Sequence, residues 1–254
     1  MSRYFIQLSF KGTDYCGWQI QANAVTVQST LNKALCTFLK EEIETTGAGR
    51  TDTGVHADFF IAHFDSVSDD LDKQQDLIYH LNGILPRDIA IQKIFRVNDD
   101  SHARFDAVSR TYKYYITNNK DPFGHEYALY LSSKPDITKM NKCAEVLKDH
   151  TDFTSFSKLH SNTKTNDCKI SGAEWKEKNG RIVFTITADR FLRNMVRAIV
   201  GTLIEAGKGK LTVEEFRNII ESKDRGKAGA SAPAHGLFLT NIEYPDIHVS
   251  GYRL

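Results

Sequence analysis

The residues best suited to catalysis lie in the segment GAGRTDTGVHA, residues 47–57. Three glycines and a run of small polar residues are not typical of a strand interior, so the segment is expected to form a tight loop between two strands. The loop presents Arg50, Asp52 and His56. From the loop alone, Asp52 could be a catalytic carboxylate or a turn former that caps backbone N–H groups, whereas His56 favours a hydrogen-bonded structural role.

Spacing excludes several familiar site types. A dinucleotide-binding loop would need glycine where Asp52 stands and a helix directly after it. A phosphate-binding loop would need a closing Gly-Lys-Ser or Gly-Lys-Thr, which this segment does not have. Cys16, Cys36, Cys143 and Cys168 are widely separated and form no C-x-x-C pair. The sequence therefore predicts no zinc site, no redox dithiol and four reduced thiols.

A second segment, SRTYKYYI at 109–116, alternates cationic and aromatic residues. On a strand, the rings of Tyr112 and its neighbouring tyrosines could stack on bases while Arg110 and Lys113 meet phosphates. An aromatic core face with a charged outer face explains the same pattern equally well.

A third segment, FLRNMVRAIVG at 191–201, places Arg193 and Arg197 four residues apart in an apolar helical pattern. An arginine in such a setting must find an anion or extend to water. Extension to water is the more common outcome, so this segment alone does not predict a site.

Hydrophobic periodicity predicts a mixture of strands and helices that positions these segments. Thr26 is a predicted helix N-cap, Thr212 and Glu215 form a capping box, and Asn179-Gly180 predicts a hairpin. We expect an α+β fold with a largely antiparallel sheet and two similar halves that meet near residue 105. The predicted strands are 4–10, 60–64, 89–97, 110–118, one ending near 177, 181–187 and 237–242; the predicted helices are 27–38, 71–85, 137–148, 191–206 and one from 212.

Composition describes a globular chain with an uneven charge distribution. The 254 residues include 33 basic and 32 acidic side chains, yet residues 151–230 have a basic excess and residues 41–100 an acidic one. A polyanion would therefore bind best to the second half, although a solvated surface would also explain the asymmetry. The stretch 198–204 is far shorter than the roughly 20 apolar residues that span a membrane. The alternating N-terminus predicts a strand and not a signal peptide, so we expect a cytoplasmic protein.

Taken together, these segments resemble the tRNA pseudouridine synthase A family. The resemblance implies a cofactor-free and metal-free isomerase that converts uridine to pseudouridine in the anticodon stem and loop of tRNA. It also implies a homodimer that grips tRNA across both subunits. The implied fold has two ferredoxin-like (RRM-like) halves, residues 1–105 and 106–254, which share a mostly antiparallel sheet and have the active site in the cleft between them. The blocks that carry the resemblance are GTDYCGWQIQ at 12–21, TVQSTLNKAL at 26–35, GAGRTDTGVHA at 47–57, HARFDAVSRTYKYY at 102–115, RFLRNMVRAIVGTL at 190–203 and AGASAPAHGLFL at 228–239.

The resemblance also assigns roles to individual residues. Asp52 is the expected catalytic carboxylate, and whether it attacks ribose C1′, attacks uracil C6 or acts as a base stays open. Arg50 is expected to hold the displaced nucleotide, Tyr112 to stack on the flipped uracil, and Leu237 to close the pocket wall. A carboxylate in a dry pocket needs a cation to stay ionised, and Arg197 resembles the family arginine that pairs with the catalytic carboxylate. The expected contacts to the tRNA backbone are Arg190, Arg193, Lys208 and Lys210, with Lys223, Arg225 and Lys227 as further candidates.

Two alternatives remain. The chain could isomerise uridine in another RNA, or it could be an RNA-binding protein that kept the fold without catalysis. The second alternative predicts loss of the aspartate in Gly-Arg-Thr-Asp, but Asp52 is present.

Overall fold

The computed structural model describes residues 1–74, 76–158 and 165–245, and these form two compact units. The first unit contains Met1–Ser109 together with the chain from Leu239, and the second contains Arg110–Phe238. The sequence placed the division near residue 105.

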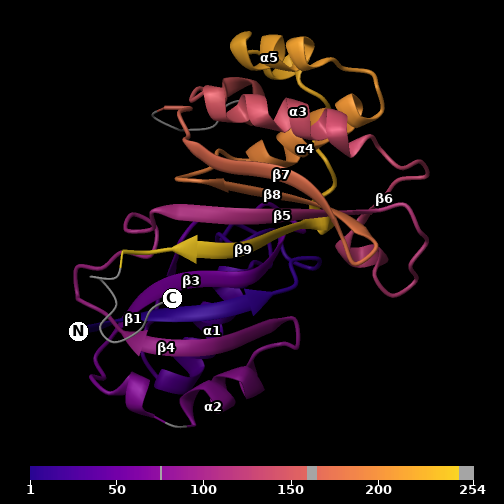
Figure 1. The fold of residues 1–254 in the computed structure, drawn as a ribbon. Helices are drawn as coiled ribbons and strands as arrows, with labels where there is room; N and C mark the ends of the chain where they lie inside the picture. Colours follow the sequence, from indigo (N-terminus) through magenta and orange to yellow (C-terminus); the bar gives the residue numbers. More distant parts are fainter. Residues whose placement is uncertain (75, 159–164, 246–254) are drawn as a thin grey trace. The chain divides into compact units, whose positions relative to one another are not determined.

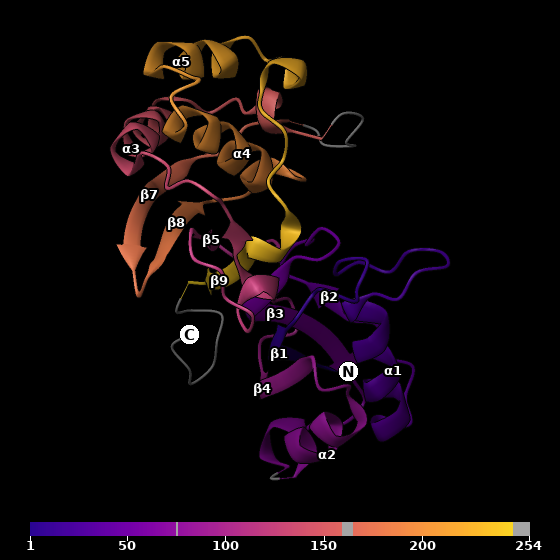
Figure 2. The same ribbon diagram turned by 90° about the vertical axis from the view of Figure 1, so that its right-hand side faces the viewer.

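The first unit has an antiparallel sheet in which β1 lies between β3 and β4, and β9 lies beside β3. Figures 1 and 2 show α1 and α2 on the same face of this sheet. The elements are β1 (Ser2–Phe10), α1 (Val27–Leu39), β2 (Thr46–Gly47), β3 (His56–Ser66), the 3-10 helix η1 (Leu71–Lys73), α2 (Leu77–Ile84), β4 (Ile89–Arg96) and β9 (Leu237–Glu243).

Alternating apolar residues of β1 form the core beneath these helices. Tyr4 pairs with Phe64 of β3, and Leu8 pairs with Phe60. All four side chains are almost completely buried. The alternation of this strand in the sequence is therefore confirmed, because side chains two residues apart point to the same face of a sheet.

The second unit has the strand order β5, β8, β7, and both pairs are antiparallel. Helices α3 and α4 lie on one side of these strands, and α5 lies outside them (Figure 1). The α+β class and the mostly antiparallel pairing are thus confirmed, whereas the ferredoxin-like form of each half stays a prediction. The elements are β5 (Ser109–Thr117), η2 (His125–Tyr127), β6 (Leu129–Tyr130), α3 (Ile137–Val146), η3 (Leu147–Asp149), η4 (Thr154–Phe156), β7 (Ile170–Lys178), β8 (Arg181–Ala188), α4 (Met195–Gly207), α5 (Val213–Glu221), η5 (Arg225–Lys227) and η6 (Ala234–Gly236).

The local turn and cap signals are confirmed. The Thr26 side chain accepts a hydrogen bond from the Ser29 N–H, and Thr212 forms the expected capping box with Glu215. Asn179-Gly180 joins β7 to β8 with φ values of 53° and 75°. Two successive positive φ angles are those of the type I′ turn that suits a two-residue hairpin.

Two predicted helices were too long. The predicted helix 71–85 is divided into η1 and α2, because Gln74 adopts an extended conformation after η1. The predicted helix 191–206 begins only at Met195, because Asn194 has a φ of 65° in the left-handed region. Arg193 therefore precedes the helix and does not share a helical face with Arg197.

Across the described ranges, every helix is too short or too polar to cross a membrane.

The first unit contains a buried histidine that makes its stability depend on pH. His63 of β3 is 7% exposed, and its Nδ1 accepts a hydrogen bond from the Ala103 N–H at 3.1 Å. Burial lowers the pKa of His63 from 6.5 to about 4, and the charges of Arg3 and His102 add to this effect while Asp65 and Asp106 oppose it. The folded protein therefore holds this ring neutral with Nδ1 as an acceptor.

We expect acidification to weaken the fold through His63. The unfolded chain binds a proton near pH 6.5 and the folded chain only near pH 4, so stability is full above pH 6.5 and is lost as the pH falls through this window. The expected loss between pH 7 and pH 5 is about 2 kcal/mol of free energy of unfolding, measured by urea denaturation. In His63→Gln, whose amide oxygen can still accept the Ala103 N–H, this loss should be much smaller, whereas replacement of the exposed His125 should not reduce it. An equal loss in wild type and His63→Gln would contradict the assignment.

Candidate active site

Asp52 lies in a loop between β2 and β3 of the first unit. The loop begins where the Ala48 N–H donates to the Ile61 carbonyl at 2.8 Å. It turns back at Asp52, whose carbonyl accepts the Val55 N–H at 3.1 Å, and Gly54 supplies a φ of 79°. The Asp52 side chain is half-buried. The expected tight loop is confirmed, and it carries Asp52 between β2 and β3.

A second segment, residues 11–18, packs against the backbone of this loop. A Cβ added to Gly17 would overlap the Thr51 carbonyl oxygen and lie 3.2 Å from the Asp52 carbonyl carbon. A Cβ on Gly12 would overlap the Val55 carbonyl oxygen. Only glycine permits such close approach, and the φ of 81° at Gly17 adds a second requirement for it. The 11–18 segment therefore fixes the path of the backbone on both sides of Asp52.

Hydrogen bonds hold the 11–18 segment in place. The Gly12 N–H donates to Nδ1 of the buried His56 at 3.0 Å, which gives His56 a structural role. The Gly54 N–H donates to the Tyr15 carbonyl at 3.3 Å. The Tyr15 hydroxyl donates to Asp88 Oδ1 at 2.7 Å, and burial together with this contact raises the pKa of Tyr15. The loop, the segment and the chain before β4 thus form one hydrogen-bonded assembly.

Thr51, directly before Asp52, carries a buried hydroxyl group. Its Oγ1 is out of contact with water and has no hydrogen-bond partner among the residues that the structure describes. Leaving a buried hydroxyl in this state costs about 1–3 kcal/mol. Such groups are uncommon, and a catalytic role is one recognised reason for them.

Tyr112 lies on β5 of the second unit, where it pairs with Ile186 of β8. Its ring is half-buried and meets Phe191 edge to face at 5.2 Å. Tyr114, two residues further on the same face, is fully buried, and its hydroxyl donates to the Pro233 carbonyl at 2.9 Å. Burial raises the pKa of Tyr114, and the positive charge of Arg197 partly opposes that rise.

Arg197 lies on α4, with its side chain half-buried. Its Nε donates to the Ala232 carbonyl at 2.8 Å, and the Ala232 N–H donates to the Arg197 carbonyl at 2.9 Å. Leu237 follows this segment at the start of β9 and is 4% exposed. In the second unit, Arg197 and Tyr114 thus bind the backbone of Ala232 and Pro233, Leu237 follows these residues in the chain, and Tyr112 lies on β5 two residues before Tyr114. Asp52 and the exposed Arg50 belong to the first unit.

The cations expected to bind the tRNA backbone differ in their surroundings. Lys208 and Lys210 both contact Glu205, at 3.1 and 3.0 Å, and these contacts lower the pKa of that carboxyl. Arg190 is half-buried beside Asp189, whose Oδ1 accepts its backbone N–H at 2.7 Å. The side chain of Arg193 is exposed.

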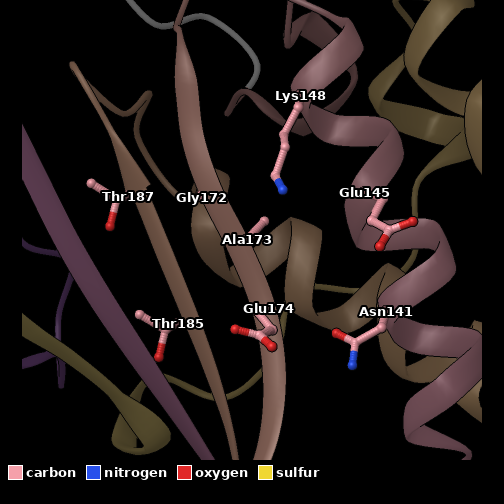
Figure 3. A pocket seen from close by; sticks show the side chains of 8 residues that line it. All are labelled: Asn141, Glu145, Lys148, Gly172, Ala173, Glu174, Thr185 and Thr187. Atoms are coloured by element: carbon pink, nitrogen blue, oxygen red, sulfur yellow. The ribbon is translucent and has the colours of Figure 1, made fainter.

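A surface hollow of about 470 Å³ lies elsewhere in the second unit (Figure 3). Its lining mixes two carboxylates and one ammonium group with small polar side chains, which favours no single ligand. None of the predicted site residues lines it, and it is therefore not the candidate site. The lining residues are Asn141, Glu145, Lys148, Gly172, Ala173, Glu174, Thr185 and Thr187.

Comparison with known proteins assigns the family. A family model described as tRNA pseudouridine synthase matches residues 146–245. The tRNA pseudouridine synthase A of Bacteroides fragilis is 55% identical over 96% of this chain and 97% of its own length. The chain belongs to the tRNA pseudouridine synthase A family. The protein of the same name from Parabacteroides distasonis is 53% identical over 97% of both chains, and that from Francisella tularensis subsp. holarctica is 38% identical over 97% of this chain and 95% of its own.

Membership of the tRNA pseudouridine synthase A family makes the chain an isomerase. For the candidate site, the sequence predicted the Asp52 loop. It did not predict that Gly12, Tyr15 and Gly17 fix the backbone of this loop. The signal was present in the block GTDYCGWQIQ, whose two glycines flank a tyrosine. What the sequence did not indicate is that this block lies against the loop some 35 residues later in the chain.

Proposed function

We propose that this chain isomerises uridine to pseudouridine in the anticodon stem and loop of tRNA, with Asp52 as the catalytic carboxylate and without a cofactor. The observation that carries the proposal is the Asp52 loop. Its backbone is fixed by the 11–18 segment, and it presents a half-buried carboxylate in a chain 55% identical to a tRNA pseudouridine synthase A. A carboxylate held in this way can serve as a nucleophile or a base without further groups, because positioning supplies much of the rate enhancement.

The reaction rearranges one nucleoside and leaves its composition unchanged. The bond between ribose C1′ and uracil N1 breaks, the base turns, and C1′ is joined to C5. The proton on C5 is released to water, and N1 takes up a proton. Since no group is transferred and no electrons are lost, the reaction needs no external reactant.

The target uridine must leave its stack before Asp52 can reach it. Extrusion costs a few kcal/mol, which contacts with the protein must offset. We assign Arg50 to the displaced nucleotide, Tyr112 to stacking on the uracil and Leu237 to the pocket wall. The exposure of Arg50 and the half-buried ring of Tyr112 are compatible with these roles.

Arg197 is proposed to pair with Asp52 and keep it ionised. The hydrogen bond from Arg197 Nε to the Ala232 carbonyl supports this assignment, because it fixes the plane of the guanidinium group. The proposal requires the two halves of the chain to form the active-site cleft together.

We further propose a cytoplasmic homodimer that binds tRNA across both subunits. Arg190, Arg193, Lys208 and Lys210 would contact the tRNA backbone, and tRNA binding should weaken steeply with added salt.

The experiment uses purified protein and tRNA labelled with tritium at uracil C5. We expect release of the label into water without any cofactor, and cells lacking the gene should lose pseudouridine from the anticodon arm. Binding without release would favour the non-catalytic alternative. Release in vitro with unchanged anticodon arms in the cells would favour a different RNA as the substrate.

A further inference from the structure

Residues 228–233, here called the strap, run along α4 in the second unit. A Cβ on Gly201 of α4 would overlap the Ala230 carbonyl oxygen, so the strap lies directly on the helix backbone. The Gly229 N–H donates to the Thr202 hydroxyl at 3.0 Å. Because the strap is neither helix nor strand, its carbonyl groups must find partners outside regular secondary structure.

Arg225 supplies partners to three strap residues at once. Its Nη1 lies 3.4 Å from the Ala228 carbonyl and 3.2 Å from the Gly229 carbonyl, and its Nη2 donates to Ser231 Oγ at 3.0 Å. Ser231 Oγ also accepts from Asn194 Nδ2 at 2.6 Å, directly before α4. The half-buried guanidinium thus spans the strap as a planar fork, a geometry that lysine does not offer.

The far end of the strap holds Arg197. Ala232 accepts from Arg197 Nε and donates its own N–H to the Arg197 carbonyl, so side chain and backbone of one arginine are tied to one strap residue. The next carbonyl, that of Pro233, accepts from the Tyr114 hydroxyl. A shift of the strap would therefore disturb both hydrogen bonds between Ala232 and Arg197.

We propose that Arg225 is a positioning residue for the active site: it holds the strap on α4, and the strap orients Arg197. The inference rests on the proposed function, in which Arg197 pairs with Asp52. It replaces the expectation from the sequence that Arg225 contacts the tRNA backbone. The two roles differ in what they require of residue 225, since a phosphate contact needs a positive charge and the strap needs a fork of N–H donors.

The test compares Arg225→Gln with the charge-preserving Arg225→Lys. We expect both variants to lower kcat for tritium release by about 10-fold to 100-fold, the range typical of a small misplacement of a catalytic group. Neither should change the affinity for tRNA or its salt dependence. Ser231→Ala, which removes one of the three acceptors, should lower kcat in the same direction by less.

A matched control is Arg217→Gln, which removes an arginine of α5 whose guanidinium contacts Asp149 Oδ2 at 3.3 Å. Among the described residues, Arg217 makes no hydrogen bond to the strap or to Arg197. This variant should keep the wild-type kcat. Independently of activity, amide hydrogen exchange should show that Arg225→Gln loses protection at the N–H groups of Gly229 and Ala232 while protection in β8 is kept.

A phosphate contact would give the opposite pattern. Arg225→Gln would then weaken tRNA binding, reduce the slope of log Kd against log salt by about one and leave kcat unchanged, and Arg225→Lys would restore binding. Unchanged protection at Gly229 and Ala232 in Arg225→Gln would also overturn the proposal. If wild-type protein released no tritium while the exchange result held, the proposed function would fail and the structural part of the inference would stand.

Discussion

Asp52→Asn should abolish tritium release from tRNA labelled at uracil C5 while tRNA binding is retained. The amide is nearly the same size as the carboxylate, so the loop should keep its path, but it carries no charge and is neither a useful nucleophile nor a base. We expect kcat to fall on the order of 10⁴-fold, as when an essential member of a catalytic group is removed. Release of the label under single-turnover conditions is the measurement, with filter binding to follow tRNA affinity.

A suitable control is Asp14→Asn, because it makes the same isosteric change at an exposed carboxylate of the adjacent 11–18 segment. It should release tritium at the wild-type rate. If Asp52→Asn did so as well, Asp52 could not be the catalytic group, and the assignments of Arg50 and Arg197 that depend on it would be withdrawn.

Sequence reasoning succeeded where the determinant of structure is local. The caps at Thr26 and Thr212 and the hairpin at Asn179-Gly180 depend on a few neighbouring residues, and each formed as expected. The same is true of the loop at Asp52, since glycines and small polar residues cannot pack as a strand interior. These features follow from backbone sterics and from hydrogen bonds within one turn.

Prediction from the sequence failed where a contact joins distant parts of the chain. The apolar pattern of residues 191–206 fits a helix, but Asn194 adopts a left-handed conformation and its side chain binds Ser231, 37 residues later. Arg225 is a different case, because its contacts are local: its donors meet the carbonyl groups of Ala228 and Gly229, three and four residues later. Its expected contact with a tRNA phosphate stays a prediction. Residue type alone does not distinguish these partners, because a guanidinium binds phosphates and carbonyls with the same N–H groups.

The second large effect is expected from Gly17→Ala, which alters no residue with a chemical role. The added methyl group would overlap the Thr51 carbonyl oxygen and lie 3.2 Å from the Asp52 carbonyl carbon, so the Asp52 loop must shift. Since a displacement of about 1 Å at a reacting group can cost roughly 100-fold in rate, we expect kcat to fall by about that factor while tRNA affinity changes little. Single-turnover tritium release and tRNA binding measured on the same preparation would separate the two quantities.

Gly180→Ala distinguishes displacement of the loop from strain in the glycine itself. Gly180 has a φ of 75°, close to the 81° of Gly17, but a Cβ there would meet no atom within 4 Å. Both variants should therefore lose about 1 kcal/mol or more of stability from the left-handed conformation, seen as a lower Tm, and only Gly17→Ala should lose turnover. A Gly17→Ala protein that folded and kept the wild-type kcat would show that the 11–18 segment does not set the position of Asp52. A common loss of kcat in both variants would mean that reduced stability and not displacement of Asp52 controls turnover.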